Sequence, residues 1–230
     1  MVMTAITENI ERVKQRLEAA AGRSGRALKD IAIVAVTKSA NVERILEAQR
    51  AGLTQFGENR VQEASEKIPL VPAEWHMIGH LQSNKIKPAL GLFQMIQSVD
   101  TVRLAEKINA ELLVENKTMS VLLQVNVSGE GQKSGFGAEE IYSAVEKIKP
   151  LTQLIVQGVM GMAPLSDDEG PKREAFKKLK NVFIVLKAMK TERFRMQTLS
   201  MGMSDDFEIA VEEGSNLVRL GRAIFGDGKK

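Results

Sequence analysis

Hydrophobic positions along this chain follow two periods, one typical of helices and one typical of buried strands. From Thr4 to Ala21, apolar residues recur at three- and four-residue steps between charged ones, which predicts an amphipathic helix. Gly22 and Gly25 are expected to end this helix. The next segment, Ile31 to Thr37, is a continuous and mostly β-branched run, which indicates a strand covered on both faces, as strands of parallel sheets are.

The alternation of a short apolar segment, a polar loop and a helical segment continues to the end of the chain. The predicted strands are Ile31–Thr37, Thr54–Gly57, Glu74–Ile78, Phe93–Ser98, Met119–Val127, Leu154–Gly161, Thr198–Ser200 and Leu217–Leu220. Further helices are predicted near Val42–Gln49, Glu58–Lys67, Asn84–Leu90, Val102–Val114, Glu139–Ile148, Lys172–Met189 and Asp206–Glu213. Alternation of this kind predicts parallel strands joined by crossover helices.

The division of the chain follows from its uninterrupted repeats. No Pro/Gly/Ser-rich linker or low-complexity segment divides it, so residues 1–230 are expected to form a single domain of the α/β class. Residues 1–25 would form an N-terminal helix and turn, and residues 31–226 the barrel. Consecutive βα units favour a closed (β/α)₈ TIM barrel, and an open doubly wound sheet is the alternative.

Composition and charge narrow the possible chemistry. The chain has no cysteine, which removes disulfides, thiolate zinc sites and cysteine nucleophiles. Its 32 Lys and Arg and 29 Asp and Glu residues are interleaved along helical segments, so no face is reserved for a nucleic acid. The N-terminus lacks a signal segment, and no apolar run approaches the roughly 18 residues that a membrane span needs. We expect a cytoplasmic protein with no membrane or nucleic-acid partner.

Residues at the carboxyl ends of the predicted strands are the candidates for a site, because barrel enzymes place their chemistry there. They are Lys38, Asn59, Arg60, His80, Asn126, Met160–Met162, Ser200–Met203 and Arg219–Arg222. Lys38 ends a buried, uncharged strand, where partial desolvation lowers the cost of deprotonating its amine and makes it a Schiff-base candidate. A solvated lysine at a strand end is the alternative interpretation.

Glycine-bearing loops follow the last two predicted strands. The first, Leu199 to Asp206, leads into a helix for which Asp205 and Glu208 are the expected N-cap and capping-box partner. In the second loop, Gly221 directly follows the last strand. Loops in these two positions of a barrel bind phosphate groups, and a plain capped loop is the alternative. A phosphate site combined with Lys38 suggests a phosphorylated aldehyde as the ligand.

Several motifs in this order resemble one known family over nearly the whole chain. The motifs are Thr37-Lys38, Phe56-Gly57-Glu58-Asn59-Arg60-Val61-Gln62-Glu63, Trp75-His76-Met77-Ile78-Gly79-His80-Leu81-Gln82-Ser83-Asn84-Lys85, Ser200-Met201-Gly202-Met203-Ser204 and Arg219-Leu220-Gly221. Together they resemble the pyridoxal phosphate homeostasis proteins, the YggS/PROSC family. The resemblance implies the barrel of fold-type III pyridoxal 5′-phosphate (PLP) proteins, similar to the N-terminal domain of alanine racemase.

The resemblance also assigns roles to individual residues. It implies that Lys38 holds PLP as a Schiff base, that Arg219 faces the pyridine nitrogen, that Asn59 lies near the 3′-oxygen and that Met162 packs on the ring. The implied phosphate ligands, largely through backbone N–H groups, are Ser200, Gly202, Gly221 and Arg222. Because a guanidinium group only donates hydrogen bonds, a ring nitrogen facing Arg219 stays unprotonated and is a poor electron sink. Without the resemblance, an arginine tied to a nearby carboxylate would be the simpler interpretation of Arg219.

Two other signals are discounted. The segment Gly129–Gly135 has the wrong spacing for a nucleotide-binding loop and is expected to be a mobile loop at the rim. His76 and His80 lie on a strand and its exit, so they lack the helical geometry of a two-histidine zinc motif, and no metal is expected. For His80 we expect a packing or loop-anchoring role, with a general base as the alternative.

The sequence therefore predicts a monomeric PLP-binding protein that serves vitamin B6 homeostasis by holding or delivering PLP, with apo-enzymes that require PLP as candidate recipients. No catalytic residue is assigned. The alternative is a racemase-like PLP enzyme. That reaction needs a second acid/base group, which alanine racemase-like enzymes take from a tyrosine of an added C-terminal domain. The only tyrosine, Tyr142, falls in a predicted outer helix, so we favour the carrier.

Overall fold

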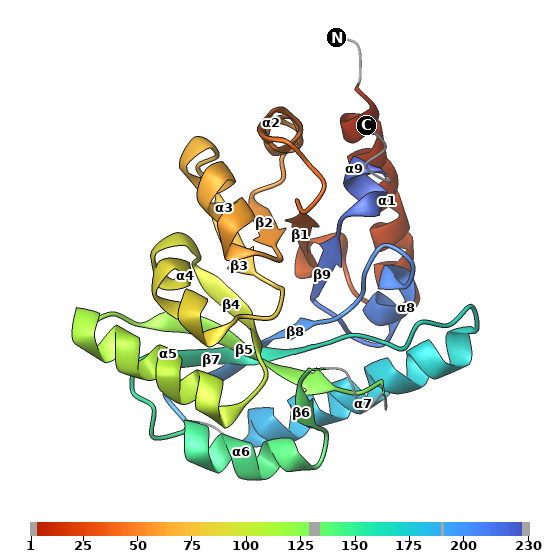
Figure 1. Cartoon of the computed structure of the whole chain (residues 1–230). Helices are drawn as coiled ribbons and strands as arrows, with labels where there is room; N and C mark the ends of the chain where they lie inside the picture. Colours follow the sequence, from red (N-terminus) through yellow and green to blue (C-terminus); the bar gives the residue numbers. More distant parts are fainter. Residues whose placement is uncertain (1–3, 129–133, 190, 227–230) are drawn as a thin grey trace.

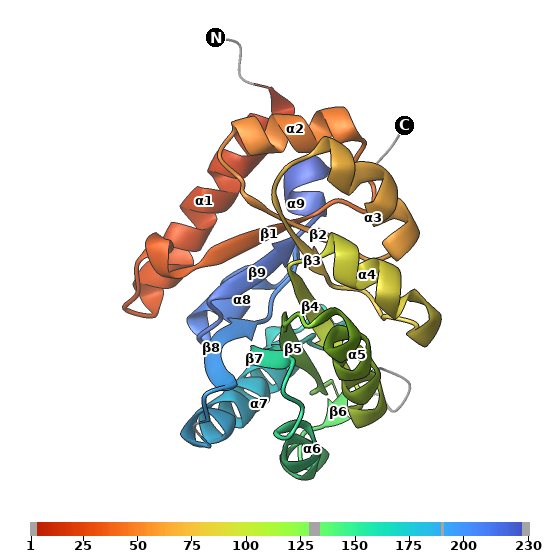
Figure 2. The same ribbon diagram turned by 90° about the vertical axis from the view of Figure 1, so that its left-hand side faces the viewer.

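Parallel strands close into a barrel, and helices form a layer around it (Figures 1 and 2). The computed structural model of the chain describes residues 4–128, 134–189 and 191–226. The barrel strands are β1 (Ala32–Val36), β2 (Gln55–Glu58), β3 (Glu74–Met77), β4 (Met95–Val99), β5 (Met119–Asn126), β7 (Leu154–Gly161), β8 (Phe194–Ser200) and β9 (Leu217–Leu220). A two-residue strand, β6 (Phe136–Gly137), pairs with the end of β5.

Two pairings close the ring. β1 pairs with β2 on one side and with β9 on the other, so the first and last strands are neighbours. β4 pairs with β5, which joins the two halves of the sheet. All pairings are parallel, so the carboxyl ends of the eight barrel strands lie at one rim. The expected closed (β/α)₈ barrel is confirmed.

The helices of the outer layer follow the strands in sequence. They are α1 (Ala5–Arg23), α2 (Val42–Arg50), α3 (Val61–Lys67), α4 (Ile86–Leu92), α5 (Val102–Glu115), α6 (Glu140–Ile148), α7 (Glu169–Ala188), α8 (Phe207–Glu212) and α9 (Arg222–Phe225), with 3₁₀ turns at Leu28–Asp30, Ile68–Leu70 and Ser83–Lys85. In the part of the chain that the structure describes, none of them is long and apolar enough to cross a membrane.

The N-terminal helix α1 precedes the first barrel strand and packs on the last helices of the chain. Its apolar stripe is buried, and Asn9 Nδ2 donates to the carbonyl oxygen of Ile224 in α9 at 3.0 Å. The helix includes Gly22 and ends at Arg23, so it extends beyond the expected last residue, Ala21. Gly25, with φ of +69°, then reverses the chain.

The structure corrects two predicted boundaries and adds one helix. Glu58, expected to begin a helix, is the last residue of β2, and its side chain is fully buried. β8 begins at Phe194, four residues before the predicted Thr198. The prediction missed its first residues because exposed Arg195 and Gln197 alternate with buried residues and interrupt the apolar run expected of a buried strand. The short helix α9, directly after β9, was not predicted.

The expected capping box before α8 is also wrong. The residue that precedes this helix is Asp206, whose Oδ1 accepts a hydrogen bond from the N–H of Met203 at 2.6 Å. Asp205 pairs with Arg222, and Glu208 pairs with Arg16 of α1 at 2.6 Å. Guanidinium groups from other elements therefore take the two carboxylates that the local pattern assigned to the helix start.

A glycine in β7 allows two barrel strands to approach closely. A Cβ atom at Gly158 would lie 1.7 Å from the carbonyl oxygen of Thr198 in β8. We expect Gly158→Ala to lower the free energy of unfolding by about 3 kcal/mol or more, because a backbone atom must move. In Gly91→Ala, in open space on α4, we expect a gain of about 0.5–1 kcal/mol. Denaturant unfolding of both variants measures the difference, and equal stabilities would contradict the close approach.

Candidate functional site

The turn that carries Lys38 lies directly after β1 at the rim of the barrel. The N–H of Ala40 donates to the carbonyl oxygen of Thr37 at 2.9 Å and closes this turn. The Lys38 side chain is exposed, and its amine has no hydrogen-bond or ion-pair partner among the described residues. β2 and β9 flank β1 in the sheet, so the Lys38 turn lies between the ends of those two strands.

A buried ionic cluster of Thr37, Glu58 and Lys67 supports the Lys38 turn from below. Glu58 Oε1 accepts hydrogen bonds from Thr37 Oγ1 and from Lys67 Nζ, each at 2.6 Å. Lys67 Nζ also donates to the carbonyl oxygen of Thr37 at 2.9 Å. The second carboxylate oxygen accepts from the N–H of Asn59 at 3.1 Å. Both carboxylate oxygens of Glu58 are therefore satisfied, and the cluster links Thr37, the residue before Lys38, to Asn59.

Arg219 of β9 is a buried guanidinium group inside the barrel. Its Nη1 donates to Ser200 Oγ at 2.6 Å and its Nη2 donates to the carbonyl oxygen of Gly161 at 2.9 Å. No carboxylate of the described residues forms an ion pair with it, so the simpler interpretation of an arginine tied to an acid is not met. Burial lowers the pKa of Arg219 to about 10, although the charge of Asp206 opposes this shift. The group therefore remains charged at neutral pH.

Hydrogen bonds tie together the loops that follow β8 and β9. The N–H of Arg219 donates to the carbonyl oxygen of Gly202 at 3.0 Å, and the N–H of Ala223 donates to Ser204 Oγ at 3.2 Å. Arg222 pairs with Asp205 across the same gap. Gly202 has φ of +97°, and a Cβ atom there would lie 2.6 Å from that of Ala210. This loop conformation therefore depends on glycine.

Gly221 brings these loops next to the Lys38 turn. A Cβ atom at Gly221 would lie 3.5 Å from the carbonyl oxygen of Val36, the last residue of β1. Lys38, Gly202, Gly221 and Arg222 are therefore gathered at one side of the rim. Ser200 lies deeper, and its hydroxyl group is engaged by Arg219 and by Gln97 Oε1, at 2.7 Å.

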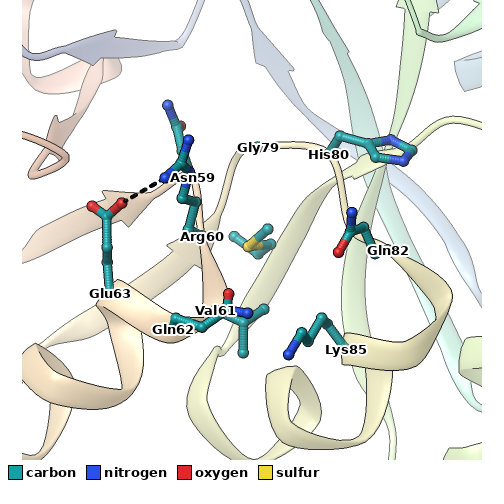
Figure 3. Close-up of a pocket in the computed structure, with 10 residues that line it drawn as sticks. Asn59, Arg60, Val61, Gln62, Glu63, Gly79, His80, Gln82 and Lys85 are labelled. Atoms are coloured by element: carbon teal, nitrogen blue, oxygen red, sulfur yellow. Dashed lines mark ion pairs between the residues drawn. The ribbon is translucent and has the colours of Figure 1, made fainter.

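Two hollows lie on either side of this group. The larger, of about 690 Å³, is lined by residues from the ends of β2 and β3 and the starts of the following helices: Asn59, Arg60, Val61, Gln62, Glu63, Met77, Gly79, His80, Gln82 and Lys85. Figure 3 shows Asn59 and Arg60 on one side of this space and Gln82 and Lys85 on the other, with Arg60 paired to Glu63 at 3.8 Å. The smaller, of about 230 Å³, is lined by Met162, Met203 and Asp206 among others.

Two strand-end residues have structural partners at the rim. His80 Nδ1 lies 2.9 Å from Asp100 Oδ2, which anchors the loop after β3 to the end of β4, the expected role. Asn126 Oδ1 accepts from Ser128 Oγ at 3.1 Å. Residues 129–133 of the predicted rim loop lie outside the described residues. Tyr142 lies in the outer helix α6 and packs against the core, as expected.

The chain matches the alanine racemase N-terminal domain family over residues 3–229. A pyridoxal phosphate homeostasis protein of Pseudomonas aeruginosa is 37% identical over 227 residues, which cover 97% of this chain and 96% of that protein. One of the same name from Vibrio alginolyticus is 39% identical over 232 residues, with 97% and 98% covered. The chain belongs to the pyridoxal phosphate homeostasis protein family. The resemblance inferred from the motifs is therefore confirmed.

A solved structure of a similar protein contains the cofactor. PipY of Synechococcus elongatus with PLP bound superimposes with a TM-score of 0.82 at 30% identity, covering 96% of this chain and all of PipY. The family members named above are described as homeostasis proteins rather than as enzymes.

Sequence reasoning missed the residues that hold the candidate site in place. Glu58 and Lys67 were assigned to one helix, and Gln97 was treated as an ordinary strand residue. Glu58 and Gln97 are polar residues at buried positions of β2 and β4, and a buried polar group signals a specific partner. Lys67 ends α3 and is only partly buried, so it gives no such signal.

The Lys67 ammonium group neutralises the buried Glu58 carboxylate. In Lys67→Met that carboxylate stays buried without a countercharge, so we expect the free energy of unfolding to fall by about 3 kcal/mol. The exposed Lys178 is the matched control, and Lys178→Met should change it by less than about 0.5 kcal/mol. Urea denaturation measures both, and a neutral Lys67→Met would show that the cluster contributes little.

Proposed function

We propose that this chain binds PLP covalently through the Lys38 amine and holds the cofactor for transfer within the cell. The observation that carries the proposal is an exposed lysine at the end of β1 that has no side-chain partner in the described part of the chain and lies near two glycine-bearing loops. The family membership and the PLP-bound structure of PipY support it. Bound PLP supplies an aldehyde that condenses with a primary amine and releases water.

The loops after β8 and β9 fit the phosphate group. Gly202 and Gly221 allow these loops to pack closely on Ala210 and on Val36, and we expect their backbone N–H groups to face the phosphate group. Arg222, which pairs with Asp205, lies at the edge. Barrels of this class bind phosphate at these loops. Ser200 remains a predicted phosphate ligand through its backbone, because its hydroxyl group already contacts Gln97 and Arg219.

The remaining predicted contacts concern the ring of the cofactor. Arg219 is charged, buried and fixed by two hydrogen bonds, so it can present a donor to the pyridine nitrogen without giving up a proton. Asn59 and Met162 line the hollows on the two sides of the Lys38 turn, which suits contacts with the 3′-oxygen and the ring face. An unprotonated ring nitrogen is a weak electron sink, which favours carrying PLP over carbanion chemistry.

The proposed role is that of a carrier in vitamin B6 homeostasis and not of a catalyst. We expect a cytoplasmic monomer whose partners, besides PLP, are apo-enzymes that require it. The Lys38 side chain is exposed at the rim, which suits such a role, because a recipient enzyme would have access to PLP at this position.

Replacing Lys38 tests the covalent step. We expect purified protein incubated with PLP to show the yellow absorbance of a pyridoxal imine, which Lys38→Ala lacks. Borohydride reduction followed by peptide mass mapping should place the adduct on Lys38. Lys85→Ala, which changes a lysine that lines the adjacent hollow, is the matched control and should keep the absorbance. A colourless wild-type protein, or an adduct mapped elsewhere, would overturn the proposal.

Replacing Gly202 tests the phosphate loop. Gly202→Ala forces the loop away from Ala210, so we expect the affinity for PLP to fall by about tenfold or more. Gly25→Ala is the control, because Gly25 also has a positive φ, but a Cβ atom there meets no other atom and the residue is far from Gly202 in the sequence. Spectroscopic titration with PLP measures both affinities. Unchanged affinity in Gly202→Ala would exclude this loop from phosphate binding.

A further inference from the structure

A row of buried polar side chains joined by hydrogen bonds crosses the interior of the barrel from Arg219, and we call this row the file. After the bonds from Arg219 to Ser200 and from Ser200 to Gln97, the file continues from Gln97 Nε2 to His76 Nδ1 at 2.8 Å. His76 Nε2 lies 3.0 Å from Glu74 Oε1. The four inner side chains are each at most 5% exposed, whereas Glu74, at the start of β3, reaches solvent.

The bond between Ser200 and Gln97 spans the barrel. Ser200 lies on β8 and Gln97 on β4, and these strands are not neighbours in the sheet. It therefore connects opposite walls, where no backbone ladder can hold the two sides together. A buried amide placed here needs partners for both its oxygen and its nitrogen, and it has both.

The hydrogen bonds of this file run in a single direction. A guanidinium group only donates hydrogen bonds. Ser200 Oγ therefore accepts a hydrogen bond from Arg219 and donates its own hydroxyl hydrogen bond to Gln97 Oε1. The amide nitrogen of Gln97 must then donate to His76 Nδ1. The neutral imidazole therefore carries its proton on Nε2 and donates it to Glu74. This bond from His76 lowers the pKa of Glu74.

The reverse arrangement is disfavoured. Turning the Gln97 amide around would require a proton on His76 Nδ1. The lone pair of a neutral Nε2 would then face the Glu74 carboxylate, and the Ser200 hydroxyl proton would lose its acceptor. A buried donor left unpaired is unfavourable, because it has lost its hydrogen bonds to water without replacement. The file therefore selects one orientation of the Ser200 hydroxyl group.

We propose that Gln97, itself oriented by His76, is a positioning residue that fixes the Ser200 lone pair and thereby the guanidinium plane of Arg219. Arg219 has no ion pair with any of the described residues, so its orientation depends on Ser200 Oγ and Gly161 O. The effect on PLP rests on the proposed function, whereas the file itself exists in the protein without the cofactor. The file runs from Arg219, near the carboxyl end of β9, to Glu74 at the start of β3, on the opposite side of the barrel.

Nitrogen NMR of the protein without PLP tests the file directly. The chain has two histidines, so the His76 signals can be assigned with a His80→Gln variant. We expect wild-type His76 to be the neutral Nε2–H tautomer. In Gln97→Met, which keeps the side-chain volume but removes the amide, the His76 Nδ1 signal should shift, and the guanidinium protons of Arg219 should exchange about tenfold faster. Wild-type His76 protonated on Nδ1, or unchanged Arg219 exchange in Gln97→Met, would overturn the proposal.

Two further variants separate positioning from simple loss of packing. Gln97→Glu keeps an oxygen acceptor for Ser200, so Arg219 exchange should stay within about twofold of wild type. Ser98→Ala, on the same strand, removes a buried hydroxyl group that has no hydrogen-bond partner and should change neither signal. If Gln97→Met unfolds, slow Arg219 exchange retained in Ser200→Ala would overturn the proposal instead, because that variant removes the acceptor itself.

A PLP titration then measures the consequence for the cofactor. We expect Gln97→Met to bind PLP about tenfold more weakly and with a shifted absorbance maximum, and Gln97→Glu to restore the maximum. If wild-type protein binds no PLP, the proposed function fails while the NMR results still decide the role of Gln97. Equal spectra and affinities in PLP-binding wild type and Gln97→Met would overturn the effect of the file on the cofactor.

Discussion

Pairing of the first barrel strand with the last closes the sheet, and the location of every candidate site residue depends on this pairing. Register between Ala32 and Leu217 places the end of β1 beside the end of β9. The Lys38 turn and Gly221 are thereby close in space, although they lie near opposite ends of the sequence. Because all barrel strands are parallel, the same closure places Asn59, Met162 and Gly202 at one rim.

Two networks of largely buried polar groups, one between the barrel and α3 and one inside the barrel, support the rim. The cluster of Thr37, Glu58 and Lys67 lies below the Lys38 turn, and the file that begins at Arg219 crosses the interior. In a site of low dielectric, satisfied hydrogen bonds are strong and unsatisfied ones are costly, so both networks favour a single arrangement. Residues expected to contact the ligand, such as Arg219, are thus held by buried residues such as Gln97 that are not expected to touch it.

Much of the fold could be predicted because parallel barrel strands leave a local signal. The β-branched run before Lys38 and the helices between strands were recognised from periodicity alone. The start of β8 was not, because Arg195 and Gln197 interrupt its apolar pattern. The capping box at Asp205 failed for a different reason, since Arg222 and Arg16 attract the carboxylates that a local motif assigned to the helix start.

The sequence by itself determined the order of the βα units and, through it, which residues stand at the strand ends, among them Lys38 and Arg219. Both follow from periodicity over a few residues. Only the tertiary structure decided which groups support them. The hydrogen bond from Ser200 to Gln97 joins residues 103 positions apart on strands that are not neighbours. Such a contact depends on how the sheet curves and closes, and no local pattern of hydrophobic and polar residues encodes it.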